Sequence, residues 1–266
     1  MSTESWAVAA PQTIEVGAVT AASVRLQAGR VEVVADAEGT SAVLEVVEVG
    51  DKPLQVVLEA GRLRVGYERT AVEAFVARVR SLGDSEHAVV RLRLPAGVTV
   101  DVGTTEADID VTGTPGTVVK TVTGAVRTVG TSGSLYLKTV SGDAGIDAHA
   151  GDVSAQTVSG NLSVTGNLGR VTVASVSAAI AVAASGTTPM VSAKTVSGDV
   201  TVRLDPGTPV SLRVRGAAGQ AVLDGHVLDS QGRTLSVDHA DPPSDGRSVA
   251  YVTATVTSAR VVVSRT

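Results

Sequence analysis

The chain has 266 residues, a formal net charge of −5 and no cysteine, and only 2% of its residues are aromatic. The acidic balance and the scarcity of aromatic rings argue against a nucleic-acid partner, which needs a concentrated basic face and stacking side chains. The missing cysteines exclude disulfides, thiolate metal sites and cysteine nucleophiles.

The first residues, MSTESWAVAAPQTIEV, contain neither a basic n-region nor an apolar run of signal-peptide length. No later segment has the roughly 20 consecutive apolar residues that a membrane helix needs. We therefore expect a cytoplasmic protein without a transmembrane segment, and association with a cell surface stays open.

Residues 13–69 predict antiparallel strands, with turns near Ala28-Gly29, Glu38-Gly39 and Ala60-Gly61. One helix candidate comes next, at residues 71–82. It begins at a capping box, Thr70 to Glu73, and ends before Gly83. We expect residues 1–100 to form an N-terminal β segment, with this helix, that caps the central part of the chain.

A repeat dominates the middle of the chain. The pentapeptide KTVSG begins at Lys138 and again at Lys194, and QTVSG begins at Gln156; Lys120, Lys138, Gln156 and Ala174 are each 18 residues apart. From Val102 the same stretch also divides into nine-residue halves. Periodicity of this kind is typical of a solenoid, so residues 101–204 predict a parallel β-helix, or β-solenoid, with 18-residue rungs in two nine-residue halves.

Two columns of the repeat are apolar and are expected to face the core. The third place holds Val122, Val140, Val158, Val176 and Val196, and the seventh holds Val126, Ala144, Leu162, Ile180 and Val200. Between them lie glycine and Asp or Asn, which suit a tight turn. The turn residues are Gly124, Gly142, Asp143, Gly160, Asn161, Gly198 and Asp199.

Residues 205–266 return to a strand pattern and are expected to close the open end of the stack, because an uncapped solenoid exposes a pairing edge. The sequence thus predicts an all-β protein with three parts, a central β-solenoid between two antiparallel β segments.

The segments VVRLRLPAGVTVDV, KTVTGAV, KTVSGDAGI, QTVSGNLSV and KTVSGDVTV together resemble a widespread bacterial family known mainly as putative adhesins with β-strand repeats. The resemblance covers roughly Val89 to Leu204 and implies a β-helix-like domain of unknown function. It carries over no catalytic residue. The chain departs from a secreted adhesin in having no export signal at its start.

Three kinds of chemistry compete with a purely structural interpretation. Calcium-binding β-rolls need stacked aspartates and paired glycines, and here Gly160-Asn161 and Gly169-Arg170 interrupt the series. A polysaccharide lyase or glycosidase needs paired carboxylates beside a sugar-stacking platform, and Tyr136 is the only aromatic residue of the repeat. The carboxylates weighed for it are Glu106, Asp108, Asp110, Asp143, Asp147 and Asp152.

The third is a weak metal site at Asp238-His239-Ala240-Asp241, for which an exposed hairpin loop is the alternative. The four histidines, His87, His149, His226 and His239, show no metal-ligand spacing. We therefore expect no catalytic residue, no metal and no cofactor.

Lys120, Lys138, Gln156 and Lys194 head successive repeats and form a candidate partner face. Stacked like charges indicate either an anionic partner or protection against edge pairing. The sequence favours a non-enzymatic scaffold that binds a protein or cell-envelope partner through a flat face rich in Ser and Thr, as a monomer or small oligomer. A self-assembling, bactofilin-like structural protein is the alternative, and a carbohydrate-active enzyme ranks lower.

Overall fold

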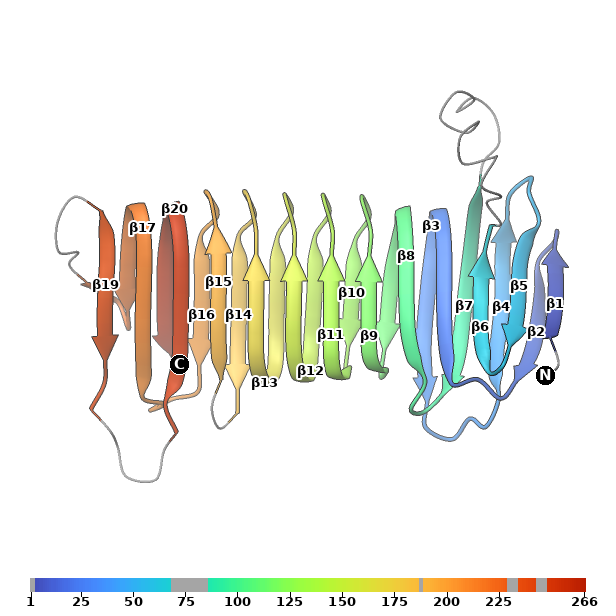
Figure 1. Cartoon of the computed structure of the whole chain (residues 1–266), viewed down its shortest axis with the longest axis horizontal. Coiled ribbons are helices and arrows are strands. Elements are labelled where there is room, and N and C mark those ends of the chain that lie inside the picture. Colours follow the sequence, from blue (N-terminus) through green and yellow to red (C-terminus); the bar gives the residue numbers. More distant parts are fainter. Residues whose placement is uncertain (1–2, 68–85, 187–188, 229–233, 243–247) are drawn as a thin grey trace. The chain divides into compact units, whose positions relative to one another are not determined.

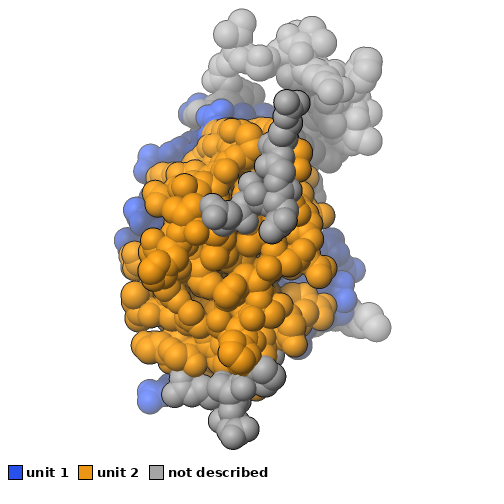
Figure 2. Space-filling model, turned by 90° about the vertical axis from the view of Figure 1, so that its left-hand side faces the viewer, with its two compact units in different colours: residues 1–125 blue, residues 126–266 orange. Residues whose placement is uncertain are grey.

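The structure is a computed structural model that describes residues 3–67, 86–186, 189–228, 234–242 and 248–266. The chain divides into two compact units, Met1–Ala125 and Val126–Thr266, which Figure 2 colours separately. Every regular element in the described ranges is a strand, so the all-β class is confirmed for them. No helix in these ranges is long and apolar enough to cross a lipid bilayer.

Unit 1 is organised around its longest strand, β3 (Ala21–Asp36). On one side β3 pairs in parallel with β8 (Thr99–Thr112), and on the other it pairs in parallel with β6 (Arg62–Gly66) and then β7 (His87–Pro95). The remaining strands are β1 (Thr3–Val8), β2 (Gln12–Gly17), β4 (Ala42–Val49), β5 (Leu54–Glu59) and β9 (Pro115–Lys120). Antiparallel pairs join β1 to β5, β2 to β4, β4 to β7 and β5 to β6.

The long strand β3 corrects one predicted turn. Ala28-Gly29 lies inside β3. Val24 and Leu26 are buried before it and Val31 after it, so the alternation of buried residues shifts at this point, where Gly29 has a φ of 116°. The expected turn at Ala60-Gly61 is confirmed, since both residues have positive φ between β5 and β6. The helix candidate at residues 71–82 lies outside the described residues.

Unit 2 consists of parallel strands with a few antiparallel additions (Figure 1). Its strands are β10 (Val126–Val129), β11 (Ser132–Lys138), β12 (Ala144–Gln156), β13 (Leu162–Ala174), β14 (Ile180–Ser185), β15 (Met190–Thr195), β16 (Val200–Leu204), β17 (Val210–Leu223), β18 (His226–Leu228), β19 (Leu235–Ala240) and β20 (Ala250–Arg265). The 18-residue spacing reappears as strand register: Val126 pairs with Ala144, and Ala144 with Leu162.

The predicted parallel β-helix or β-solenoid is nevertheless wrong. The strands β13, β14, β16, β20 and β15 each pair in parallel with the next, and β15 pairs with β13 again, so five parallel strands form a closed barrel. Other strands are bonded outside it, including β12 on β13 and β17 on β20.

Two features explain why nine-residue halves failed to describe this topology. The strand β13 runs without a break from Leu162 to Ala174, so its first part pairs with β14 and its second with β15. The strand that completes the ring, β20, comes from the end of the chain and not from the next repeat. A periodic sequence cannot indicate closure by a strand so distant along the chain.

Short strands of unit 2, such as β14 and β16, alternate buried and outward residues, whereas the longer β12 and β13 shift this alternation near their middle. The seventh column of the repeat, Val126, Ala144, Leu162, Ile180 and Val200, is buried as predicted. The third column is not: Val122 in unit 1 and Val140, Val158, Val176 and Val196 in unit 2 are all 42–46% exposed. The structure divides the chain into two units. The division into residues 1–100, 101–204 and 205–266 remains a prediction from the sequence.

Candidate functional site

The repeated corner TVSG points its threonine inward and its valine outward. Thr139, Thr157 and Thr195 are between 2% and 6% exposed, whereas the valines next to them are among the most exposed large apolar side chains of the described residues. The hydroxyl of Thr157 donates to the carbonyl of Ser159 at 2.9 Å. The buried threonine therefore satisfies its own polar group within the corner.

Serine and glycine then bind each corner to its neighbour. The amide and the hydroxyl of Ser159 both donate to the carbonyl of Val140, and those of Ser177 donate to Val158. Gly160 has a φ of 101°, and a β-carbon there would lie 2.4 Å from the carbonyl oxygen of Gly142. Only glycine fits such a close approach of two backbones.

The acidic residues of the corner also bridge from one strand layer to the next. Asp143 Oδ1 accepts the amide hydrogen of Asn161 at 2.8 Å, and Asp199 Oδ1 accepts that of Arg260 at 2.9 Å. Asp152 accepts the amide hydrogen of Arg170 in the same way. These carboxylates are structural acceptors in the described part of the chain.

One outward face of unit 2, here called the flat face, is built from β11, the C-terminal halves of β12 and β13, then β15 and the start of β20. Figure 1 shows β11, β12, β13 and β15 side by side. Strand register places hydroxyl groups in one row across it and longer side chains in a second row. The hydroxyl row is Tyr136, Ser154, Thr172, Ser192 and Thr253, and the second row is Lys138, Gln156, Ala174, Lys194 and Thr255.

The flat face carries positive charge in a chain that is acidic overall. Lys138, Arg170 and Lys194 are exposed on it, and Asp152 is the exposed carboxylate between them. Of the predicted partner residues, the structure thus brings Lys138, Gln156 and Lys194 into one row. The sequence predicted a flat face rich in Ser and Thr, but it did not identify Arg170 or the members of the hydroxyl row, because they do not belong to the repeated pentapeptide.

Lys120, the fourth predicted partner residue, belongs to unit 1. It lines an open groove of about 450 Å³ with Arg25, Tyr67 and Glu86. The polar groups there are engaged within the protein: Arg25 pairs with Asp101 at 2.5 Å, and the Tyr67 hydroxyl donates to the carbonyl of His87. The groove has the size of a small-molecule site but lacks an uncommitted cluster of polar groups in its described lining.

The carboxylates weighed for polysaccharide cleavage do not converge. Asp110 pairs with Arg30 at 2.6 Å, and Asp108 accepts the amide hydrogen of Ala125. In unit 2, Asp147 lies 3.7 Å from Arg127. Asp108, Asp110 and Asp147 therefore each have their own partner, and none of these pairs forms the facing acid and nucleophile of a glycosidase.

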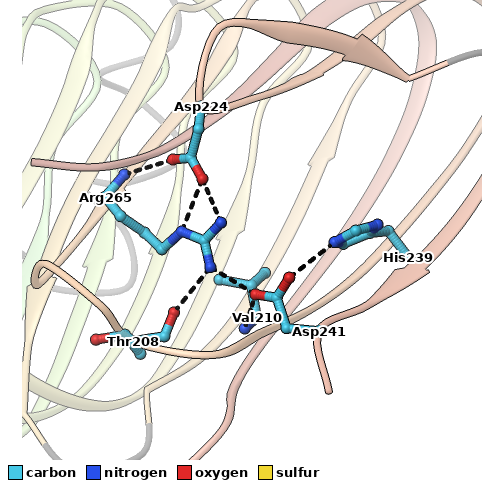
Figure 3. Close-up of polar contacts among 6 residues, drawn as sticks. All are labelled: Thr208, Val210, Asp224, His239, Asp241 and Arg265. Atoms are coloured by element: carbon cyan, nitrogen blue, oxygen red, sulfur yellow. Dashed lines mark hydrogen bonds and ion pairs between the residues drawn. The ribbon is translucent and has the colours of Figure 1, made fainter. Parts of the chain in front are cut away.

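A polar network ties the last strand of the chain to the outer strands of unit 2 (Figure 3). The guanidinium of Arg265 binds the carboxylate of Asp224 and lies 2.5 Å from Asp241 Oδ2. Asp241 also accepts the amide hydrogen of Val210 at 2.9 Å and lies 3.0 Å from His239 Nε2. Burial raises the pKa of Asp241, but these hydrogen bonds and the charge of Arg265 outweigh it, so the pKa is lowered.

The carboxylates considered for a metal site at residues 238–241 bind protein groups instead. Asp238 lies beside Arg213 and Arg215, whose hydrogen bonds lower its pKa, and Asp241 is occupied as described. Within the described ranges, no group of three or more His, Asp or Glu side chains is placed to hold a metal ion. Protein donors take the positions that a cation would need.

His149 is a polar group that the sequence did not single out. It is 0% exposed, and its Nδ1 lies 2.9 Å from the hydroxyl of Thr131. Its Nε2 is buried without a hydrogen-bond partner in the described structure. Burial lowers the pKa of His149, although nearby backbone groups of Gly133, Asp152 and Thr131 oppose the shift.

No protein-family model matches the chain, and neither does any curated protein. Several solved structures do match the chain. A protein of Parabacteroides distasonis described as a "putative lipid binding protein" has 11% identity and a TM-score of 0.46, over 99% of this chain and 96% of that one. A "putative adhesin" of Bacteroides fragilis has 7% identity and a TM-score of 0.44, over 98% and 97%. A "putative cell adhesion protein" of Clostridium sporogenes has 10% identity and a TM-score of 0.33, over 97% and 100%.

Two of these neighbours share the adhesin description with the family that the sequence resembles, but membership of that family is not shown. With identities of at most 11% and TM-scores below 0.5, the likenesses carry no argument about what this chain binds.

Proposed function

We propose that the chain is a non-enzymatic binding protein whose flat face docks an anionic partner, either an acidic protein or an acidic polymer of the cell envelope. One observation carries the proposal: strand register holds Lys138 and Lys194 in one row beside a row of hydroxyl groups, with Arg170 on the same face. A flat, rigid array of cations and hydroxyls suits a repetitive partner that bears carboxylates or phosphates.

The rigidity of the face supports this proposal. The outward side chains stand on strands whose inward neighbours, such as Val153, Ala155 and Val173, are fully buried. The face therefore needs no rearrangement to bind, and the entropy cost falls on the partner. The catalytic alternative lacks such support, since Asp108, Asp110 and Asp152 bind separate partners within the described residues.

The test is direct binding of the full chain to two immobilised probes, poly-glutamate for the protein source and polygalacturonate for the envelope source. We expect binding to at least one probe, weakening as salt is added. The double variant K138E/K194E should bind at least about tenfold more weakly, a change of roughly 1.4 kcal/mol.

The matched control is R203E, which reverses one exposed cation on β16, outside the flat face. This variant should bind like the wild type. Absence of binding to both probes at low salt, or equal loss of binding in K138E/K194E and R203E, would contradict the proposal.

A further inference from the structure

The exposed valines of unit 2 form a continuous apolar strip. The valine strip is defined here as Val140, Val158, Val176 and Val196, each 42–46% exposed. Backbone hydrogen bonds from the adjacent serines join each valine to the next, for example Ser159 to Val140 and Ser177 to Val158. Since neighbouring strands lie about 4.8 Å apart, the four valines extend over roughly 15 Å.

The two borders of the strip carry a matched pattern. One border is the row Lys138, Gln156, Ala174 and Lys194, two residues before each valine. The other is the row Asp143, Asn161, Ala179 and Asp199, three residues after each valine, which successive backbone hydrogen bonds hold in register. All these residues except the half-buried Ala174 are exposed.

Taken layer by layer, the borders complement each other. The first and fourth layers have a lysine on one border and an aspartate on the other. The second layer has glutamine opposite asparagine, and the third has alanine on both borders. The next layer, with Thr255 and Arg260, ends the pattern.

This pattern makes the strip complementary to itself for one symmetry only. A two-fold axis parallel to the strip exchanges its borders and keeps the order of the layers. Lys138 then faces Asp143 of a second copy, Lys194 faces Asp199, and Gln156 faces Asn161. A two-fold axis across the strip would instead bring Lys138 opposite Lys194, with like charges in contact.

We infer that the valine strip is the contact surface for a second copy of this chain, related by a two-fold axis parallel to the strip. Valines of the two copies bury each other, and the four lysine-aspartate contacts flank them. The surface is narrow, so the dimer belongs to the weak, reversible class of interfaces and not to the obligate one.

The inference is independent of the proposed function, although Lys138 and Lys194 border both surfaces. The variants that test it therefore leave the flat face unchanged. V158D/V176D places charges on the strip, and D143N/D199N removes the border charge while keeping an oxygen that can accept the amide hydrogens of Asn161 and Arg260. V227D is the matched control, since Val227 is 54% exposed on β18, outside the strip.

The experiment is sedimentation velocity over a dilution series, with the full chain and each variant. We expect the wild type and V227D to show the same concentration-dependent dimer, V158D/V176D to remain monomeric, and D143N/D199N to dimerise at least about tenfold more weakly, or roughly 1.4 kcal/mol. Thermal melts of each variant confirm that the fold is intact before its oligomeric state is compared.

A wild type that stays monomeric throughout the series would overturn the inference, as would a dimer that survives V158D/V176D. Binding of anionic lipid vesicles that V158D/V176D abolishes, without any self-association, would also overturn it and assign the strip to a membrane surface. The probes of the flat face are read separately: a monomeric V158D/V176D that still binds poly-glutamate or polygalacturonate separates the two surfaces.

Discussion

Thr157 and Val158 are neighbours in the corner between β12 and β13, and their side chains point in opposite directions: Thr157 is 5% exposed and Val158 is 44% exposed. The polar residue lies in the core and the apolar residue outside it. The same inversion recurs at Thr139-Val140 and Thr195-Val196. Each threonine hydroxyl binds the backbone of its own corner: Thr139 and Thr157 donate to a carbonyl, and Thr195 accepts the amide hydrogen of Gly198. The valine side chain remains exposed.

This inversion predicts opposite effects for adjacent substitutions. T157D should lower the free energy of unfolding by about 3–5 kcal/mol, because it buries an unpaired charge. V158D should change it by no more than about 0.5 kcal/mol, because the side chain is exposed. Urea denaturation of both variants checks the prediction, and equal losses of stability would show that both side chains face the core.

The close approach of two backbones at Gly160 predicts an intolerant position. G160A should lower the free energy of unfolding by about 3 kcal/mol or more, because its β-carbon meets the carbonyl of Gly142 and φ is positive. Gly130 also has positive φ, but a β-carbon there would have no other atom within 4 Å, so G130A should cost only about 1–2 kcal/mol. Denaturation curves that show G130A to be less stable than G160A would contradict this packing.

Buried His149 predicts that acid destabilises the protein. Its folded-state pKa lies below the unfolded value of roughly 6.5, so the unfolded state binds the proton more readily. The contribution of neutral His149 to the free energy of unfolding is therefore fully present above about pH 6.5 and is lost as the pH decreases below that value. Urea midpoints at several pH values should show the fall in the wild type and in H226Q, an exposed control, and a shallower fall in H149Q. Identical pH profiles for wild type and H149Q would contradict the prediction.

The network around Arg265 predicts a contribution to stability from the end of the chain. R265M should lower the free energy of unfolding by about 2 kcal/mol, since it leaves the carboxylates of Asp224 and Asp241 without their cation. R260M changes an exposed arginine on the same strand and should have little effect. The measurement is thermal unfolding at neutral pH.

The lowered pKa of Asp241 predicts that the effect of R265M on stability depends on pH. Because this pKa is lowered in the folded protein, its contribution is present above an unfolded value of about 3.9 and is lost as the pH falls through the folded value. The difference in the free energy of unfolding between wild type and R265M should therefore become smaller at acidic pH. A difference that widens there would contradict the assignment.

The sequence predicted the strand content, the 18-residue register and one core column, because alternation and repeat length are local properties. It did not predict that β20 closes the ring of β13, β14, β16 and β15, since that pairing joins strands far apart in the chain. Hydropathy also misplaced Val158, because the hydrogen bond that draws Thr157 inward depends on the turn and not on polarity.

For the site, the repeat located the row of Lys138, Gln156 and Lys194. The hydroxyl row from Tyr136 to Thr253 became visible only through pairing, since no pentapeptide marks it. The self-complementary borders of the valine strip likewise need both the register and the exposure of each layer.

The central claim is that the flat face of unit 2 binds an anionic partner. The most direct measurement is the affinity of wild type, K138E/K194E and R203E for immobilised poly-glutamate and polygalacturonate at low and raised salt. The account predicts salt-sensitive binding by wild type and R203E to at least one probe, and a loss of at least about tenfold in K138E/K194E. Affinities that are the same for all three proteins, or no binding by the wild type, would contradict it.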